Sequence, residues 1–190
     1  MAAYTTIDNP ELYFQTVLYT GNGSTQTISY PNADADLDAD MIWIKQRSQE
    51  TSHTIFDSVR GVQEAIFTNN INAETTRTDA VSAFGTDGFD LGANGDLNAN
   101  TETHVAWCWK AGTAFSNDAS ATSVGTIDSA GSVSADAGFS ILTWTSTAAA
   151  HTVAHGLSAT PAVIIMKGRH ESNNWMVYHH KNTSSPETDY

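Results

Sequence analysis

An acidic stretch, residues 31–40, is the first part of the sequence whose residue types could do chemistry. It carries an aspartate at every second position from Asp34 to Asp40, and carboxylate oxygens are ligands that Ca²⁺ prefers. An EF-hand loop counted from Asp34 needs glycine at its sixth place and an acid at its twelfth, where this chain has Ala39 and Lys45. The spacing excludes an EF-hand and leaves two interpretations, a looser lectin-type calcium site and a solvated acidic loop.

Five histidines near the C-terminal end could hold a metal: His151, His155, His170, His179 and His180. His151 and His155 have the spacing of zinc ligands on a metalloprotease helix, but no glutamate lies between them. His179 and His180 are adjacent, so on a strand they should point to opposite faces. We expect surface or core histidines, the alternative being a metal held at the axis of a trimeric fibre.

The remaining reactive residue types form no catalytic motif. Asp57 and Arg60 are an acid and a base at the end of an expected strand, where a local ion pair is favoured because arginine is a poor proton carrier. Cys108 stands between two tryptophans of an alternating segment, which predicts a buried, inert thiol. No G-x-S-x-G nucleophile elbow or phosphate-binding loop occurs. We therefore predict no catalytic residues, no cofactor, no metal ligands and no enzymatic activity.

Three tryptophans are candidates for stacking on sugars. Trp43, Trp144 and Trp175 all fall within expected strands or beside them, and indole rings on a β-sheet can bind sugar rings. Core packing explains each of them equally well. The ligand-binding residues therefore stay open at this point.

The elements that must position these residues are short strands separated by turns. Alternation of apolar and polar residues predicts strands at 13–20, 25–30, 41–47, 53–59 and 103–111, and a strand or helical turn at 62–68. Asp87-Gly88 between apolar residues predicts a tight turn. No amphipathic helix is apparent. The pattern favours an all-β protein, an antiparallel β-sandwich of the jelly-roll or lectin-like kind.

The chain also repeats itself. The segment 14–20 returns 125 residues later at 139–145, and the segment 42–47 returns 122 residues later at 164–169. The three-residue difference falls in the acidic loop, where an insertion costs little. The period is too long for a solenoid, so we predict a tandem second copy.

The repeat divides the chain into four parts. We expect an N-terminal leader at 1–12, a first β-sandwich repeat at 13–112, a Ser/Ala/Gly-rich linker at 113–137 with one weak strand at 123–127, and a partial second repeat at 138–190. The leader is either a docking peptide or a loosely ordered terminus. The second repeat lacks its last strands, so we expect that the polypeptide continues beyond Tyr190 or that a partner chain completes the sheet.

Composition excludes several classes of partner. With 8 Lys+Arg against 21 Asp+Glu, the formal net charge is −13, which argues against nucleic acid and anionic membranes. A single cysteine excludes an intrachain disulfide framework. The N-terminus has neither the basic nor the apolar region of a secretory signal, and no apolar run reaches the roughly 18 to 20 residues of a membrane span.

A series of motifs resembles a known domain family. In order, these are Tyr19-Thr20-Gly21-Asn22-Gly23-Ser24, Ile42-Trp43-Ile44-Lys45-Gln46-Arg47-Ser48, Phe56-Asp57-Ser58-Val59-Arg60-Gly61, Ser82-Ala83-Phe84-Gly85-Thr86-Asp87-Gly88-Phe89-Asp90-Leu91-Gly92 and Val105-Ala106-Trp107-Cys108-Trp109-Lys110-Ala111. The series covers nearly the whole chain and is similar to a family common in tailed phages of marine bacteria and cyanobacteria, whose members look like tail fibre or spike components with tandem β domains.

The resemblance implies a place in the virion and no chemistry. We expect a structural virion protein, a fibre, spike or other appendage of the particle surface that mediates attachment or host adsorption. Assembly would take place in the host cytoplasm. The expected partners are further copies of the chain, with a trimer as the usual fibre stoichiometry, other virion proteins and a host surface glycan. The alternative is a carbohydrate-binding β-sandwich module of a surface protein, with an enzyme such as a depolymerase a distant third.

Overall fold

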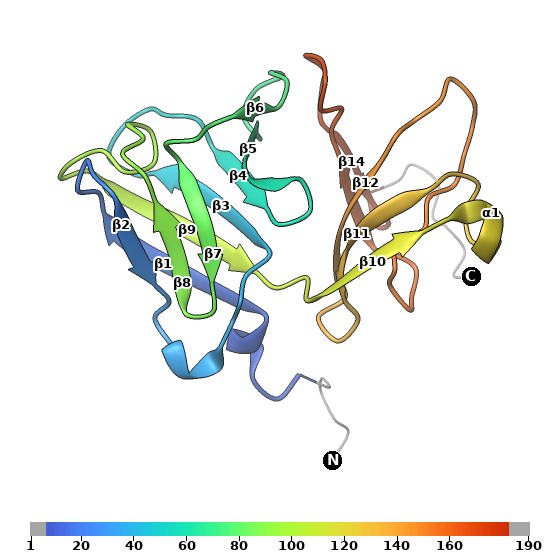
Figure 1. Ribbon diagram of the computed structural model, residues 1–190, viewed down its shortest axis with the longest axis horizontal. Coiled ribbons are helices and arrows are strands. Elements are labelled where there is room, and N and C mark those ends of the chain that lie inside the picture. Colours follow the sequence, from blue (N-terminus) through green and yellow to red (C-terminus); the bar gives the residue numbers. More distant parts are fainter. Residues whose placement is uncertain (1–6, 183–190) are drawn as a thin grey trace.

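The computed structural model describes residues 7–182, which form antiparallel β-sheets with very little helix (Figure 1). The elements are η1 (Pro10–Leu12), β1 (Phe14–Thr20), β2 (Gln26–Ser29), η2 (Ala33–Ala35), β3 (Met41–Gln46), β4 (Thr54–Asp57), β5 (Gly61–Phe67), β6 (Thr75–Thr76), β7 (Val81–Gly85), β8 (Gly88–Leu91), β9 (Thr103–Trp109), β10 (Thr113–Asn117), α1 (Ala119–Thr122), β11 (Ser129–Ser134), β12 (Phe139–Trp144), β13 (Val163–Met166) and β14 (Met176–His179).

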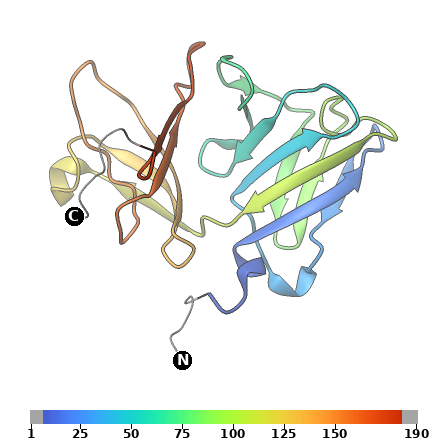
Figure 2. The ribbon, with the colours of Figure 1, turned by 180° about the vertical axis from the view of Figure 1, so that it is seen from behind.

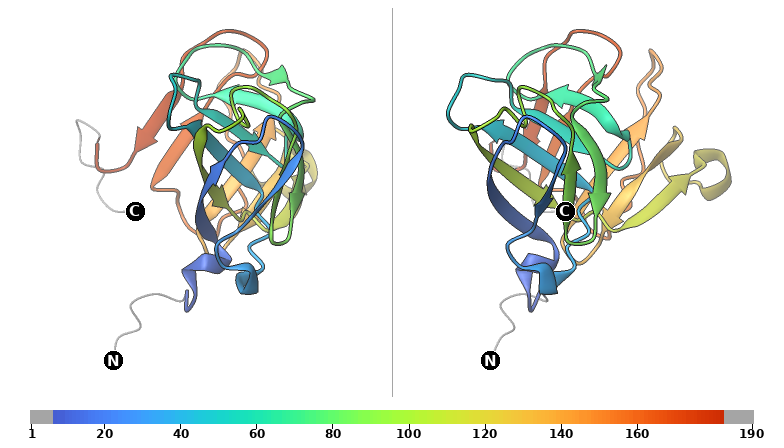
Figure 3. Two further views of the ribbon diagram at one scale, coloured as in Figure 1. Left: turned by 90° about the vertical axis from the view of Figure 1, so that its left-hand side faces the viewer. Right: turned by 60° about the vertical axis from the view of Figure 1, so that its left-hand side comes forward.

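The first half is a β-sandwich, as the sequence pattern predicts. A six-stranded sheet in the order β1-β9-β3-β4-β5-β6 packs against a three-stranded sheet in the order β2-β8-β7. The three-stranded sheet lies in front in Figure 1 and the six-stranded sheet in Figure 2, while Figure 3 views the first half from its side. All pairs of named strands are antiparallel, and β7 and β8 are joined by the turn expected before Gly88.

The core of the sandwich is built by strict alternation along the central strands. On β3, Ile42, Ile44 and Gln46 point inward and are buried, while Met41, Trp43 and Lys45 share the outer face and are half-buried. On β9, the inward residues include Ala106 and Cys108, neither of which is exposed to solvent. Period-two alternation on a sheet with one covered face produces this pattern.

The segment from 113 to 137 is not a linker. It contains β10, the short helix α1 and β11, and β10 and β11 form a three-stranded sheet with β12. The expected weak strand at 123–127 is also wrong, because only Ile127 there makes an isolated bridge, to Val153. A composition rich in Ser, Ala and Gly is typical of linkers. Here these small residues let the backbones of neighbouring strands approach closely. Gly131 lies against the Ile141 carbonyl of β12, where a Cβ atom would be 2.2 Å from that oxygen.

The remaining two strands form a hairpin whose register matches one in the first half. In the first half, Met41 pairs with Asp57 and Ile44 with Thr54 across β3 and β4. In the second half, the residues 122 positions later make the equivalent four pairs across β13 and β14, from Val163–His179 to Met166–Met176. The surroundings differ, because β13 and β14 stand alone as a two-stranded sheet.

The two halves touch through loops. Arg169 and Trp175 lie in the loop between β13 and β14. Arg169 contacts the segment that joins β5 to β6, and Trp175 contacts the last residue of β5. The Arg169 Nη2 atom is 2.6 Å from Glu74 Oε1, and the Trp175 indole N–H donates to the carbonyl oxygen of Phe67 at 2.7 Å. Trp109 of β9 also stacks on Phe139 of β12, with ring centroids 6.3 Å apart. These three contacts, two from a loop and one between strands, hold the second half against the first.

Candidate functional site

The outer face of the six-stranded sheet carries a row of aromatic rings. Trp43 on β3 and Trp107 on β9 are cross-strand partners, with ring centroids 5.7 Å apart and planes inclined by 63°. His53, just before β4, packs edge-on against Trp43 at 6.1 Å. Phe14 and Trp109 make a similar contact at 4.9 Å further along the sheet. Alternation explains the row, since both strands turn the residues between these rings inward.

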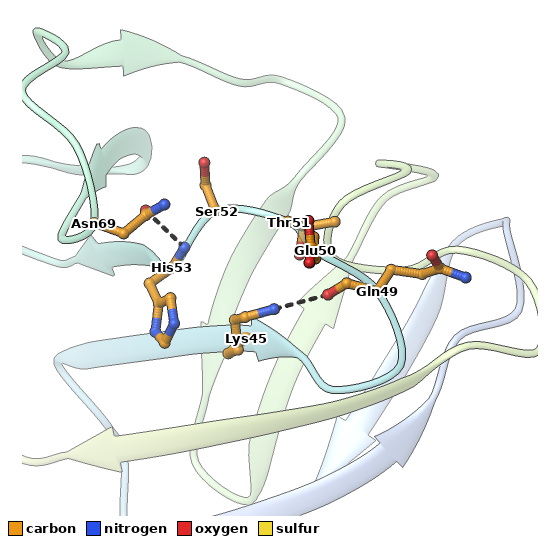
Figure 4. Close-up of a pocket in the computed structure, with 7 residues that line it drawn as sticks. All are labelled: Lys45, Gln49, Glu50, Thr51, Ser52, His53 and Asn69. Carbon is orange, nitrogen blue, oxygen red and sulfur yellow. Dashed lines mark hydrogen bonds between the residues drawn. The ribbon is translucent and has the colours of Figure 1, made fainter.

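An open pocket lies beside this row, at the end of β3 (Figure 4). It is lined by Lys45, Gln49, Glu50, Thr51, Ser52, His53 and Asn69. The Lys45 ammonium group donates to the carbonyl oxygens of Gln46 and Gln49, the latter at 2.9 Å. The His53 backbone N–H donates to Asn69 Oδ1 at 3.0 Å. These bonds fix the 47–53 loop as one wall of the pocket.

Several polar atoms at this place have no partner among residues 7–182. The Trp43 indole N–H, His53 Nδ1 and the Thr51 hydroxyl are all buried without a hydrogen bond to a described residue. A buried polar group that lacks a partner costs free energy, and such groups are candidates for contact with water or a ligand. Sequence reasoning found Trp43 but missed His53 and Thr51, because nothing in the sequence brings the loop back onto the indole.

The electrostatics of the pocket keep its histidine neutral. Burial and the nearby Lys45 ammonium group lower the pKa of His53, so its imidazole is neutral at pH 7. A neutral imidazole, an indole N–H and a hydroxyl beside aromatic rings can donate hydrogen bonds to sugar hydroxyls or accept hydrogen bonds from them. Glycoside hydrolysis normally uses two carboxyl groups, and among the described lining residues Glu50 is the only one.

None of the three sugar-stacking candidates is among the residues that line this pocket, although Trp43 packs against its His53. Trp175 is half-buried, and its N–H is engaged with Phe67 between the halves. Trp144 is half-buried at the end of β12, opposite Ser129 of β11. The structure does not bring the three tryptophans together.

The acidic loop turns its carboxylates outward. Ala35, Leu37 and Ala39 are buried against the sandwich, while the aspartates between them are exposed. Asp40 is different, because its Oδ2 atom accepts the backbone N–H groups of Ala111 and Gly112 at 2.8 and 2.6 Å. Residues 7–182 contain no group of three or more His, Cys, Asp or Glu side chains placed to hold a metal ion. The loop acts as a strap over the core.

The C-terminal histidines are mostly exposed or half-buried. The expectation that His179 and His180 on a strand point to opposite faces does not apply, and their rings stack at 5.2 Å with planes 13° apart. The physical reason is that β14 ends at His179, so the strand geometry no longer applies to His180, whose Nδ1 lies 3.2 Å from the carbonyl oxygen of Ala162.

The expected ion pair between Asp57 and Arg60 is confirmed, and it is part of a larger buried cluster. The Arg60 Nε atom is 2.5 Å from Asp57 Oδ2, and its Nη1 is 2.8 Å from Glu74 Oε2. Glu74 in turn binds Arg169 of the second half. Sequence reasoning missed Glu74 and Arg169, which are 95 positions apart.

Cys108 is buried, as predicted. Its side chain has no exposure, and burial raises the pKa of its thiol far above the usual range. It therefore stays protonated and packs as a small apolar residue.

No helix of residues 7–182 is long and apolar enough to span a membrane.

Comparison with known proteins places the chain in one family. No curated protein and no solved structure matches the chain. One family model, described as a domain of unknown function (DUF7483), matches residues 9–189. Because the match covers both halves, the sandwich and the sheets after it are parts of one conserved family unit, and the chain belongs to the DUF7483 family.

Proposed function

We propose that the protein is a structural component of the surface of a tailed-phage particle, a fibre, spike or similar appendage that contributes to attachment. The observation that carries the proposal is the β13–β14 hairpin, which exposes large apolar side chains on an otherwise polar, acidic chain. Exposed apolar patches of this kind are typical of assembly surfaces. The ordered motifs that resemble phage appendage proteins support the location, and self-association, as a trimer by the usual fibre stoichiometry, is part of the proposal.

The location is tested on particles. Antibodies raised against the recombinant chain are applied in immunogold electron microscopy to intact particles purified from lysates that encode it. We expect gold on the particle surface, and mass spectrometry should find the chain in the same particles. A chain found only in the soluble fraction of the lysate, with unlabelled particles, contradicts the proposal.

A carbohydrate-binding module is the second candidate, and the pocket beside Trp43 favours it. Within residues 7–182, the Trp43 indole N–H, His53 Nδ1 and the Thr51 hydroxyl have no hydrogen-bond partner, and groups of this kind suit a sugar. A glycan array tests this candidate, with Trp43→Phe as the variant that keeps a ring but removes the indole N–H. The matched control is Trp109→Phe, on the same sheet face outside the pocket. Binding by the wild type that Trp43→Phe weakens and Trp109→Phe does not supports the module, and a silent array rejects it.

A further inference from the structure

The pocket at the end of β3 (Figure 4) is lined by a segment that has an equivalent in the second half. Residues 45–53, the first segment, and residues 167–175, the second segment, each lie between the last paired residues of their hairpins. They have the same length, stand 122 positions apart and both begin with Lys-X-Arg. The second segment is bound to other parts of the chain, so it shows what a segment of this kind can bind.

The second segment binds a loop of the first half, residues 67–74. Arg169 holds the Glu74 carboxylate group through its Nε and Nη2 atoms, at 2.9 and 2.6 Å. Two N–H donors, the backbone of Asn173 and the indole ring of Trp175, bind two main-chain carbonyl oxygens of the loop at 3.0 and 2.7 Å. The bound loop therefore presents one carboxylate group and two carbonyl oxygens.

The first segment carries polar side chains at the three equivalent positions, which are Arg47, Thr51 and His53. Arg47 is exposed and belongs to none of the ion pairs formed within residues 7–182. The Thr51 hydroxyl and His53 Nδ1 are buried, and neither has a hydrogen-bond partner in the described part of the chain. Buried polar groups are normally hydrogen-bonded, and both of these can donate a hydrogen bond. The three side chains therefore match the carboxylate and carbonyl groups that the second segment binds.

The loop at 67–74 cannot be the ligand of the first segment as well. Its Asn69 is part of the pocket wall and accepts the His53 backbone N–H at 3.0 Å. Its Glu74 carboxylate group is bound by Arg169. The same loop thus has the first segment on one side and the second segment on the other, and a ligand of the pocket has to be a different loop.

We propose that the pocket at the end of β3 is a peptide-binding site for a loop of a different polypeptide chain, one that presents a carboxylate group and two main-chain carbonyl oxygens as residues 67–74 do. Arg47 binds the carboxylate group through charge-assisted hydrogen bonds, while Thr51 and His53 donate to the carbonyl oxygens. Glu50 lines the pocket and repels a carboxylate group inside it, which leaves the exposed Arg47 as its place. The second half favours a peptide over a sugar as the ligand, and the inference holds whether or not the protein is a virion component.

The probe that tests the proposal is a cyclic peptide with the sequence of residues 64–76. Glu64 and Thr76 are cross-strand partners in the chain, so joining the two ends of the peptide keeps the loop closed and reduces the entropy lost on binding. Calorimetry measures its binding to the whole chain, and we expect saturable binding. A chain that binds no peptide overturns the proposal, and a chain that binds a sugar on the glycan array but not the peptide overturns it in favour of the sugar.

Hydrogen exchange shows where the peptide binds. We expect slower amide exchange in residues 47–53 when the peptide is present and no change in residues 167–175. The peptide has the sequence of the chain's own loop, so it could instead displace that loop from the second segment. Faster exchange in residues 67–74 would show such displacement and would overturn the assignment of the pocket.

Two charge-removing variants test the role of Arg47. We expect Arg47→Gln to weaken peptide binding about fivefold or more, since it removes the cation that binds the carboxylate group. Lys181→Gln removes the same charge from an exposed residue outside the pocket and should leave binding unchanged. A peptide with Glu74→Gln should bind the wild-type chain as weakly as the original peptide binds Arg47→Gln. Equal binding by Arg47→Gln and the wild type overturns the proposal.

Discussion

Asp40 shows how a residue that resembles a metal ligand can be a structural one. Its Oδ1 accepts the Ser58 hydroxyl at 2.7 Å, and its Oδ2 accepts the N–H groups of Ala111 and Gly112, where the chain leaves β9. One side chain thus ties the end of the acidic loop to the residue after β4 and to the segment before β10. Asp34, six residues earlier, is exposed.

At this scale we predict that Asp40→Ala lowers the free energy of unfolding by about 2 kcal/mol, because hydrogen bonds to a charged group contribute roughly that much. Asp34→Ala is the matched control, and we expect it to change the stability by less than about 0.5 kcal/mol. Urea denaturation followed by tryptophan fluorescence measures both. The strap interpretation is wrong if the two variants are equally stable, or if calcium raises the stability of the wild type and not of Asp34→Ala.

At the scale of elements, the three-stranded sheet depends on a close approach between β2 and β8. Gly88 on β8 pairs with Ser29 on β2. A Cβ atom at Gly88 would lie 2.1 Å from the carbonyl oxygen of Ile28, which is backbone and cannot move aside. Gly95, in the loop after β8, has no atom within 4 Å of the same position.

We therefore predict that Gly88→Ala destabilises the protein by about 2 kcal/mol or more, since overpacking of this kind forces backbone shifts. Gly95→Ala should stay within about 0.5 kcal/mol of the wild type. Thermal unfolding followed by circular dichroism compares them. A Gly88→Ala protein as stable as Gly95→Ala would mean that β2 and β8 are further apart than the structure has them.

At the scale of the whole molecule, one carboxylate joins the two halves. Glu74 lies between Arg60 of the first half and Arg169 of the second, and its side chain is 10% exposed. Burial alone would raise the pKa of Glu74, but the hydrogen bonds and charges of Arg169 and Arg60 outweigh burial and hold the pKa below its usual value of 4.5. A carboxylate with a lowered pKa stabilises the folded state above its unfolded pKa, and this stabilisation is lost as the pH falls through its folded pKa.

The prediction is that Glu74→Gln costs about 3 kcal/mol at neutral pH, because it leaves a buried guanidinium group short of its counter-charge. The difference from the wild type should shrink as the pH falls below 4.5 and through the folded pKa, since a protonated glutamate resembles glutamine. Urea denaturation from pH 7 to pH 3 measures it. Arg77→Gln, at the more exposed pair with Asp96, is the control and should cost less than about 1 kcal/mol. A difference independent of pH would contradict the role of Glu74.

The sequence by itself determined the local structure of the first half. Alternation predicted the strands β3 and β9, and the position of Cys108 between two tryptophans of an alternating segment predicted its burial. These features follow from period-two geometry, which is local. Most of the first half, and Trp43 beside the candidate pocket, could therefore be predicted from the sequence.

Only the tertiary structure decided which faces are covered and which distant residues meet. Alternation on β1 leaves its core face undetermined, and the structure buries Val17 while Leu18 is 64% exposed. β10 and β11 were missed because their small side chains carry no alternation signal, and their pairing is with β12, further along the chain. Glu74 meets Arg169, and His53 meets Trp43, by packing of separate elements. Such contacts depend on how sheets and loops stack, which no local periodicity encodes.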